Sequence, residues 1–326
     1  MNNENKIGPN RQIEQKTNQE IRGIANQALE NERVKLAAAY EAHSGLDHLT
    51  QLEGRGHLYA KLEKKIKQHL HHLQNESITN LPPLPVSVAY VDVDYLAKYN
   101  ALGAGHAAGD VAVESIADHL KKVQSSQAFR IGGDEFVLVT DTEKMQATND
   151  VARQKTEVSK EFINESDLPL GFNFGCADLA EAMFVFNDAF PEKERTALLR
   201  SNQEKVVNIL AEIMIKIADY RATWRKISER IILLVDLYEE EIQGASDLAG
   251  GRYSKNIDFL KKGAGRATLK EIRILVNLKS RNSELFQTEL MKIIRRETTG
   301  AALRTRSEAS ATLLEKTIID HAIKTN

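Results

Sequence analysis

The spacing of apolar residues along the chain alternates between two periods, one typical of helices and the other of strands. At residues 58–70 every fourth position is apolar, which predicts a helix with one buried face. The run 86–91, Val-Ser-Val-Ala-Tyr-Val, follows three prolines and has the length and composition of a buried strand. Further elements are predicted in the order helix, strand, strand, helix and strand, from about residue 110 and at 129–131, 136–140, 143–162 and 171–175. This order indicates an α+β domain with a central, mainly antiparallel sheet flanked by helices.

The chain on either side of this domain is helical in pattern. Residues 1–43 are polar with spaced apolar positions, which predicts an N-terminal helix that buries its apolar stripe against a partner. From residue 203 onward almost every segment has helical spacing. We therefore expect an N-terminal helical segment at 1–43, an α+β domain at 44–202 and an all-α C-terminal region at 203–326, to which the pattern assigns no role.

Composition and charge narrow the class of protein. Apolar residues make up 42% of the chain and charged residues 28%, which is typical of soluble globular proteins. The formal net charge of −2 gives no general attraction to nucleic acid or anionic lipid, so we expect neither nucleic acid nor a membrane as a partner. The first twenty residues lack the apolar core of a secretory signal, which favours a cytoplasmic location. A single cysteine, Cys176, excludes an intrachain disulfide.

Carboxylates gather where the predicted strands end. Asp92 directly follows a predicted strand, while Asp134 and Glu135 stand in the turn of the predicted hairpin. Like charges this close repel one another unless a cation neutralises them, and hard oxygen ligands favour Mg²⁺ over zinc or copper. Gly132 and Gly133 would supply the positive φ angles of a two-residue turn and let an anionic ligand approach the backbone. The pattern predicts a divalent-metal site for phosphate chemistry; a surface hairpin with exposed acids is the alternative.

The residues in and around this turn resemble the GGDEF family of diguanylate cyclases. Segment 47–55, Asp-His-Leu-Thr-Gln-Leu-Glu-Gly-Arg, looks like the family's opening D-x-L-T-x-L-x-x-R. Residues 92–110 resemble its D-x-D…N…G-H-x-x-G-D stretch, and Gly175 falls where the family has a glycine in its last strand. The signature itself stands, after Arg130, at Gly132, Gly133, Asp134, Glu135 and Phe136. The resemblance covers residues 45–180 in order and implies the nucleotidyl-cyclase, palm-like fold of the family.

This resemblance implies an enzyme that joins two GTP molecules into cyclic di-GMP and releases pyrophosphate. By similarity, Asp92, Asp134 and the main-chain carbonyl of Val93 would hold Mg²⁺ against the GTP phosphates, with Glu135 in support. Asp134 and Glu135 would be the catalytic acids, and Asp134 would help to deprotonate the attacking 3′-hydroxyl.

The same resemblance implies how the substrate is recognised. Asn100 and Asp110 would bind the edge of the guanine base, because a carboxylate accepts from its N1–H and its exocyclic amine, a donor pair that adenine does not present there. Each protomer would supply one GTP, so we expect a homodimer in catalysis, with the N-terminal helix as a plausible organiser.

The chain departs from the family pattern at positions that bind phosphate or product. After the D-x-D motif, Leu96 and Ala97 stand where the family has phenylalanine and lysine, and Lys98 follows one residue later as a candidate replacement. Val123 and Ser126 occupy the places of the R-x-x-D motif that forms the inhibitory product site. We therefore expect no such inhibitory site in this chain.

The family's lysine and arginine that grip phosphates, four residues apart on a late helix, have two candidate pairs here. Lys226 and Arg230 follow an Ala-Asp pair at the family's offset, whereas Lys262 and Arg266 fit the local pattern K-x-x-G-R. The sequence leaves open whether one of these pairs or neither binds phosphate. An incomplete grip favours a second interpretation, in which a catalytically weak GGDEF domain binds GTP or cyclic di-GMP and signals through its helical region.

Overall fold

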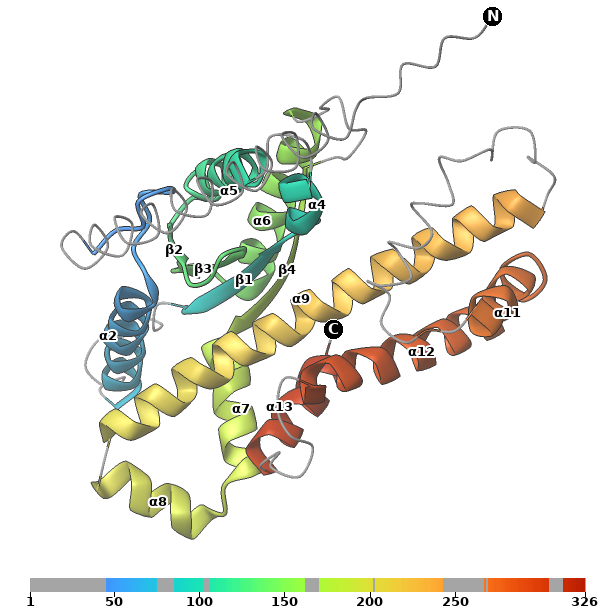
Figure 1. Cartoon of the computed structure of the whole chain (residues 1–326). Helices are drawn as coiled ribbons and strands as arrows, with labels where there is room; N and C mark the ends of the chain where they lie inside the picture. The colour runs from blue at the N-terminus through green and yellow to red at the C-terminus, as the bar shows by residue number, and fades with distance from the viewer. Residues whose placement is uncertain are drawn as a thin grey trace, which may run out of the picture.

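A four-stranded antiparallel sheet forms the centre of the computed structural model (Figure 1), which describes residues 45–74, 85–101, 106–161, 170–201, 203–242, 267, 269–304 and 313–325. The spatial order is β2-β3-β1-β4. Its strands are β1 (Ser87–Val93), β2 (Ser126–Arg130), β3 (Glu135–Thr140) and β4 (Phe172–Asp178). The predicted α+β fold with an antiparallel sheet flanked by helices is confirmed. The helix predicted within residues 1–43 lies outside the described residues.

Helices cover both faces of the sheet and bury its alternating side chains in two cores. On one face, Val91 and Val93 of β1 join a core with α5 (His106–Leu120) and α6 (Lys144–Glu161). On the other face, Val88 and Tyr90 pack in a core with α2 (Arg55–Gln74), α7 (Leu179–Ala189) and α9 (Gln203–Ile242). The nearly continuous apolar run that predicted β1 therefore reflects burial on both sides of the sheet.

Two boundaries differ from those that the sequence predicted. The helix expected from about residue 110 begins at His106, because Gly109 lies inside it rather than ahead of it. The hairpin between β2 and β3 has a longer turn than the two residues expected, since β2 ends at Arg130 and β3 begins at Glu135.

The longest helix, α9, lies in close contact with β4 and β1 (Figure 1). This contact requires a glycine at position 175. A Cβ added to Gly175 would lie 2.2 Å from the carbonyl oxygen of Ala218 and 2.6 Å from the amide nitrogen of Ala222. Both atoms belong to the α9 backbone and cannot move aside, so the glycine fixes how closely the helix approaches the sheet.

The C-terminal half of the chain adds further helices around α9. They are α8 (Glu192–Ser201), α11 (Leu269–Lys279), α12 (Ser283–Arg304) and α13 (Leu313–Lys324). The division of the chain into domains at residues 44 and 203 stays a prediction, and α9, which begins at the second of these positions, shares a core with the sheet. None of the helices in the described part of the chain has both the length and the apolar character that crossing a bilayer requires.

A buried ion network attaches α13 to the sheet domain. Glu181, which caps the N-terminus of α7, accepts hydrogen bonds from Arg221 Nη2 of α9 at 2.7 Å and from Lys144 Nζ of α6 at 2.7 Å. Burial acts to raise the pKa of Glu181, but these hydrogen bonds outweigh it and lower the pKa to about 2. From α13, His321 Nε2 lies 3.6 Å from Glu181, and the Thr325 side chain just beyond the helix bonds to Arg221.

Replacing Gly175 with alanine should destabilise the fold, because the new Cβ would overlap the backbone of α9. We expect the free energy of unfolding to fall by at least about 2 kcal/mol in urea denaturation, as in overpacked cores. Gly56→Ala in α2 is the matched control, since a Cβ at Gly56 meets nothing within 4 Å. That variant should change stability by less than about 1 kcal/mol. Equal stability of the two variants would show that the approach of α9 does not depend on Gly175.

Candidate functional site

Strand pairing brings the predicted acidic residues to one edge of the sheet. Asp92 of β1 lies directly opposite Glu135 of β3, and the amide of Val93 donates to the carbonyl oxygen of Asp134 at 2.9 Å. Burial raises the pKa of Asp92, and the nearby charges of Asp134 and Glu135 raise it further, while Lys226 acts to lower it. The carboxylates of these three acids therefore interact through space.

The signature turn owes its shape to close packing rather than to left-handed backbone. The prediction that Gly132 and Gly133 have positive φ angles is wrong, because neither residue adopts one in this longer turn. A Cβ at Gly132 would instead lie 2.4 Å from Oε2 of Glu135, so the glycine makes room for that carboxylate. Phe136 is fully buried and anchors the start of β3 in the core.

The D-x-L-T segment holds this turn in place through one ion pair. Asp47 accepts from Arg130 Nη1 at 2.9 Å and from the amide of Thr50 at 2.7 Å. Arg130 in turn donates to the carbonyl oxygens of Gly132 at 3.2 Å and Gly133 at 2.8 Å. Burial acts to raise the pKa of Asp47, but the hydrogen bonds from Thr50 and Arg130 keep the pKa below its usual value. Two motifs far apart in the sequence thus form one structural unit.

Basic side chains of α9, which packs on one face of the sheet, lie beside the acids at the strand ends. Lys226 Nζ forms an ion pair with Oδ1 of Asp92, and the guanidinium of Arg230 lies 5.6 Å from the centre of the Tyr95 ring. Asp219 precedes Lys226 by seven residues, two helical turns, and therefore lies on the same face of α9. Of the two candidate basic pairs, Lys226 and Arg230 are thus beside the acidic edge, while Lys262 and Arg266 lie outside the described residues.

Two further acids, the buried Asp94 and the half-buried Asp219, lie near this edge. Burial raises the pKa of Asp94 to about 6, and burial together with the charges of Glu135 and Asp92 raises the pKa of Asp219 to about 7. Asp94 Oδ1 accepts from Asn173 Nδ2 at 2.6 Å. Such a concentration of perturbed carboxylates is typical of functional sites.

The residues predicted to bind guanine lie beside one another at the start of α5. A Cβ at Gly109 would lie 1.9 Å from Oδ1 of Asn100, so the Asn100 side chain, from α4 (Leu96–Ala101), rests on the helix turn that carries Asp110. Ala97 of α4 is exposed, in the place of the family's lysine. The side chain of Lys98 lies outside the described part of the structure. The packing therefore brings the Asn100 side chain against Gly109, the residue before Asp110, and requires a glycine at that position.

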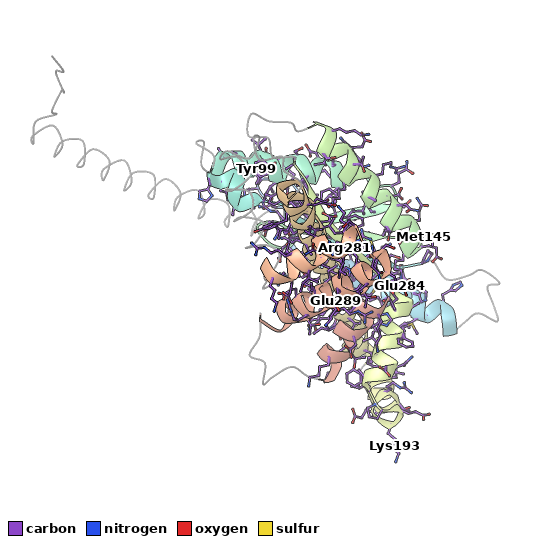
Figure 2. The ribbon with its side chains drawn as sticks, turned by 90° about the vertical axis from the view of Figure 1, so that its right-hand side faces the viewer. Tyr99, Met145, Lys193, Arg281, Glu284 and Glu289 are labelled. Atoms are coloured by element: carbon purple, nitrogen blue, oxygen red, sulfur yellow. The ribbon has the colours of Figure 1, made fainter. Side chains whose placement is uncertain are left out.

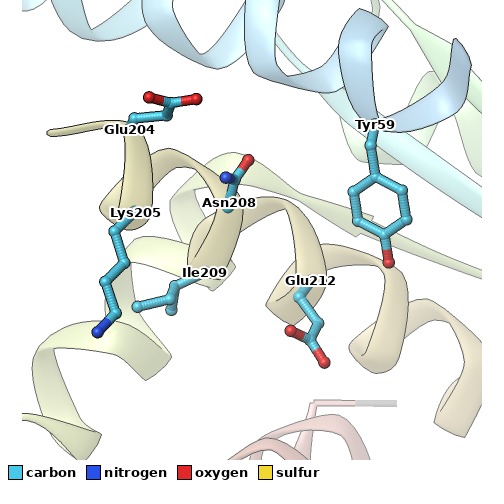
Figure 3. Close-up of a pocket in the computed structure, with 6 residues that line it drawn as sticks. All are labelled: Tyr59, Glu204, Lys205, Asn208, Ile209 and Glu212. Atoms are coloured by element: carbon cyan, nitrogen blue, oxygen red, sulfur yellow. The ribbon is translucent and has the colours of Figure 1, made fainter. Parts of the chain in front are cut away.

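Two pockets lie between α2 and α9 and lead toward the signature turn. The inner pocket, about 310 Å³, is bordered by Arg55, Tyr90, Glu135 and Asp219 among others. The outer pocket, about 620 Å³, lies beside the first turns of α9 (Figure 3). Tyr59 and Glu212 line both pockets, which therefore adjoin. This groove gives access to Glu135 from the side of α2.

The positions of the family's inhibitory product site carry no charged pair. Val123 is buried, and Ser126 Oγ donates to the main-chain carbonyl of Val123 at 2.8 Å. Both side chains are engaged within the fold and neither carries the charge that would clamp a product. That no inhibitory site exists in the chain stays a prediction.

The donor set at the sheet edge fits Mg²⁺, provided that part of the coordination comes from elsewhere. Asp92, Asp134 and Glu135 offer only hard oxygen ligands, and their mutual repulsion favours a cation. No group of three or more His, Cys, Asp or Glu side chains is arranged to hold a metal ion within the described ranges. Mg²⁺ is usually bound by one or two carboxylates together with water and substrate phosphates, so a partial protein cage suits it better than zinc.

The described structure defines an α+β domain with an antiparallel sheet, carboxylates at one edge of that sheet and basic side chains of α9 beside them. The family model described as "Diguanylate cyclase, GGDEF domain" matches residues 44–190. The chain contains a GGDEF domain, and this domain belongs to the family of the diguanylate cyclase domains, whose members typically depend on Mg²⁺. No match was found among curated proteins.

Several solved structures resemble the chain. The GGDEF domain of DgcB from Caulobacter crescentus, in complex with c-di-GMP, is 20% identical with a TM-score of 0.35, over 41% of this chain and 75% of that one. The diguanylate cyclase SiaD from Pseudomonas aeruginosa, in complex with its activator SiaC, is 22% identical with a TM-score of 0.34, over 52% of this chain and 65% of that one. A sensory box/GGDEF family protein from Caulobacter crescentus is 24% identical with a TM-score of 0.31, over 41% of this chain and 82% of that one.

Sequence reasoning missed two residues of this region. Asn173 lies opposite Asp92 in the β1–β4 register, and its Oδ1 is buried without a hydrogen-bond partner. The sequence analysis used Asp219 only to place Lys226 and Arg230 relative to the family pattern, although its carboxylate interacts with the charges of Glu135 and Asp92. A polar residue two positions before Gly175, within an otherwise apolar strand, was the signal available for Asn173.

Replacing Asp47 with asparagine should loosen the signature turn, because Arg130 would lose its charged partner. We expect a loss of about 1–3 kcal/mol in the free energy of unfolding. Hydrogen exchange should accelerate at the amides of Ile131 and Gly132, which donate to the carbonyl of Glu135. Glu63→Gln, which removes an exposed ion pair with Lys67, should change stability by less than about 1 kcal/mol. Unchanged exchange in Asp47→Asn would show that the ion pair does not hold the turn.

Proposed function

We propose that this protein is a diguanylate cyclase that condenses two GTP molecules into cyclic di-GMP with release of pyrophosphate. The observation that carries the proposal is the ion pair between Lys226 and Asp92, which sets a basic helix face against the acidic edge of a GGDEF domain. A triphosphate with its cation requires both kinds of group side by side. The exposed-hairpin alternative does not account for this, since an isolated acidic turn needs no basic helix across from it.

The acidic residues have distinct roles in this proposal. Asp92, Asp134 and the carbonyl of Val93 would hold Mg²⁺, with Glu135 in support. The metal ion, when bound, supplies positive charge that stabilises the charge developing on the reacting phosphate. Asp134 would take the proton from the attacking 3′-hydroxyl, a role open to a partly exposed carboxylate at the tip of the turn.

Basic and polar residues would hold the substrate. Lys226 would exchange Asp92 for phosphate oxygens when GTP binds, and Arg230, four residues later on α9, would bind the same triphosphate. Asn100 and Asp110 would bind the guanine edge. The 3′-hydroxyl of one GTP would attack the α-phosphate of the other, and pyrophosphate would leave. This step would occur twice. Because each domain would bind one GTP, two protomers would have to face each other.

A second candidate function is supported by the segment after Asp94. Ala97 takes the place of the family's lysine, so the site has one fewer cation for the triphosphate unless Lys98, one residue later, replaces it. A domain with this weaker grip would bind GTP or cyclic di-GMP and signal through its helices without turnover.

Incubation of the purified full chain with GTP and Mg²⁺ separates the two candidates. We expect cyclic di-GMP and pyrophosphate, detected by chromatography, and a loss of roughly 100-fold or more in Asp134→Ala, because the charge at the reacting centre is removed. Asp141→Ala, at the opposite end of β3 and exposed, is the matched control and should retain activity. Near-wild-type synthesis by Asp134→Ala would make the catalytic assignment wrong. GTP binding without any product from the wild type would favour the second candidate.

Base selection should depend on Asp110. Adenine would leave this carboxylate acceptor unsatisfied at a cost of about 1–3 kcal/mol, which corresponds to roughly 5- to 150-fold in favour of GTP. Asp110→Ser should narrow the GTP-to-ATP ratio and leave the Mg²⁺ dependence unchanged, since the residue does not belong to the acidic edge. The measurement is product formation from GTP, from ATP and from their mixture. An unchanged ratio in the variant would remove Asp110 from the guanine site.

A further inference from the structure

The turn of α9 that carries Lys226 and Arg230 is shared between the candidate site and the C-terminal helices. Ile227 and Ile231 directly follow the two basic residues in the sequence, and both are buried in an apolar cluster with α11 and α12. Successive residues of a helix point about 100° apart around its axis. The same two turns therefore present their charges to the acidic edge and their isoleucines to the C-terminal helices.

The two cores of α9 meet at this point. Up to Ala222, the buried apolar residues of α9 belong to the core that it shares with the sheet. From Trp224 onward they belong to a second cluster, here called the α9–α11–α12 cluster. Its members are Trp224, Ile227, Ile231, Leu234, Val235, Tyr238, Ile272, Leu275, Val276, Leu290, Ile293 and Ile294.

The α11–α12 hairpin runs beside this second half of α9 (Figure 1). Figure 2 views it from outside, with Arg281 and Glu284 marking the turn between the two helices. Lys279 Nζ of α11 donates to Asp236 of α9 at 2.8 Å and to Glu239 at 2.5 Å. These exposed ion pairs add little stability by themselves, so the apolar cluster is the main attachment of the hairpin to α9.

We propose that α11 and α12 position Lys226 and Arg230 against the acidic edge, and thereby set the affinity of the site for a nucleoside triphosphate. The claim about affinity rests on the proposed function, in which these two side chains bind GTP phosphates. Without the hairpin, the apolar stripe from Trp224 to Tyr238 would face water, and this part of α9 would lose the packing that fixes it. Ile227, Ile231 and Ile294 are positioning residues: they act on the site through α9 and do not touch the substrate.

The test compares two identical truncations in the full chain. Ile294→Ala removes a buried side chain of the α9–α11–α12 cluster, whereas Ile318→Ala removes an equally buried one of α13, in the core on the sheet side. Acylation of Lys226, measured by mass spectrometry without nucleotide, reports how firmly its ammonium is held at Asp92. Binding of a non-hydrolysable GTP analogue reports the affinity, and the fluorescence of Trp224, the single tryptophan, reports the packing of the cluster.

In Ile294→Ala we expect Lys226 acylation to rise roughly threefold or more, because local opening of α9 exposes the amine. Trp224 emission should shift to the red, and affinity for the analogue should fall roughly 5- to 50-fold, as expected when positioned groups are displaced. Ile318→Ala should leave Lys226 acylation, Trp224 emission and affinity for the analogue unchanged. Ile294→Val, which removes a single methylene, should have a smaller effect in the same direction and serves if the alanine variant does not fold.

The outcomes distinguish this inference from the proposed function. Equal Lys226 acylation in the wild type, Ile294→Ala and Ile318→Ala would overturn the inference, whatever the nucleotide does. Raised acylation in Ile294→Ala alone, with weaker binding of the analogue, would support it in full. Raised acylation in a protein whose wild type binds no GTP analogue would support the positioning of Lys226 and overturn its role in phosphate binding.

Discussion

The close contact between α9 and Gly175 of β4 is the constraint on which the rest of the structure depends. Because no side chain separates the two backbones there, the helix lies low over the sheet. Two turns later it reaches the strand ends, where Lys226 meets Asp92. A helix held farther out by the thickness of one side chain would leave this ammonium short of the acid. The glycine thus fixes the core and the position of the charged groups together.

The acidic edge carries more negative charge than the fold alone requires. Burial raises the pKa values of Asp92, Asp94 and Asp219 above their usual values, and Lys226 acts to lower each of them. Buried like charges destabilise a protein, and well-packed apolar residues would serve the core better. Their presence here is understandable if the edge binds a cation and a polyphosphate, because those ligands relieve the repulsion that the unliganded protein bears.

The sequence predicted the sheet and its acidic edge because these features depend on local pattern. A nearly continuous apolar run specifies β1, and the signature motif specifies which acids lie at its end. The sequence could not decide between Lys226 with Arg230 and Lys262 with Arg266. Because α7 and α8 lie between β4 and α9, the number of residues after β4 did not indicate which pair lies near the acids. The sequence also assigned residues 203–326 to a separate region, since helical spacing reveals an apolar stripe but not the partner that covers it.

The boundary between the two cores of α9 explains why the C-terminal helices and the site cannot be independent. Helix backbone transmits displacement because its hydrogen bonds resist bending within a few residues, and only Thr223 separates the last residue of one core from the first of the other. The network of Arg221 and Glu181 fixes the helix on the sheet side of this boundary. On the other side, the buried apolar residues of α9 pack against α11 and α12. Lys226 lies just past the boundary, where the packing of α9 against α11 and α12 sets its distance from Asp92.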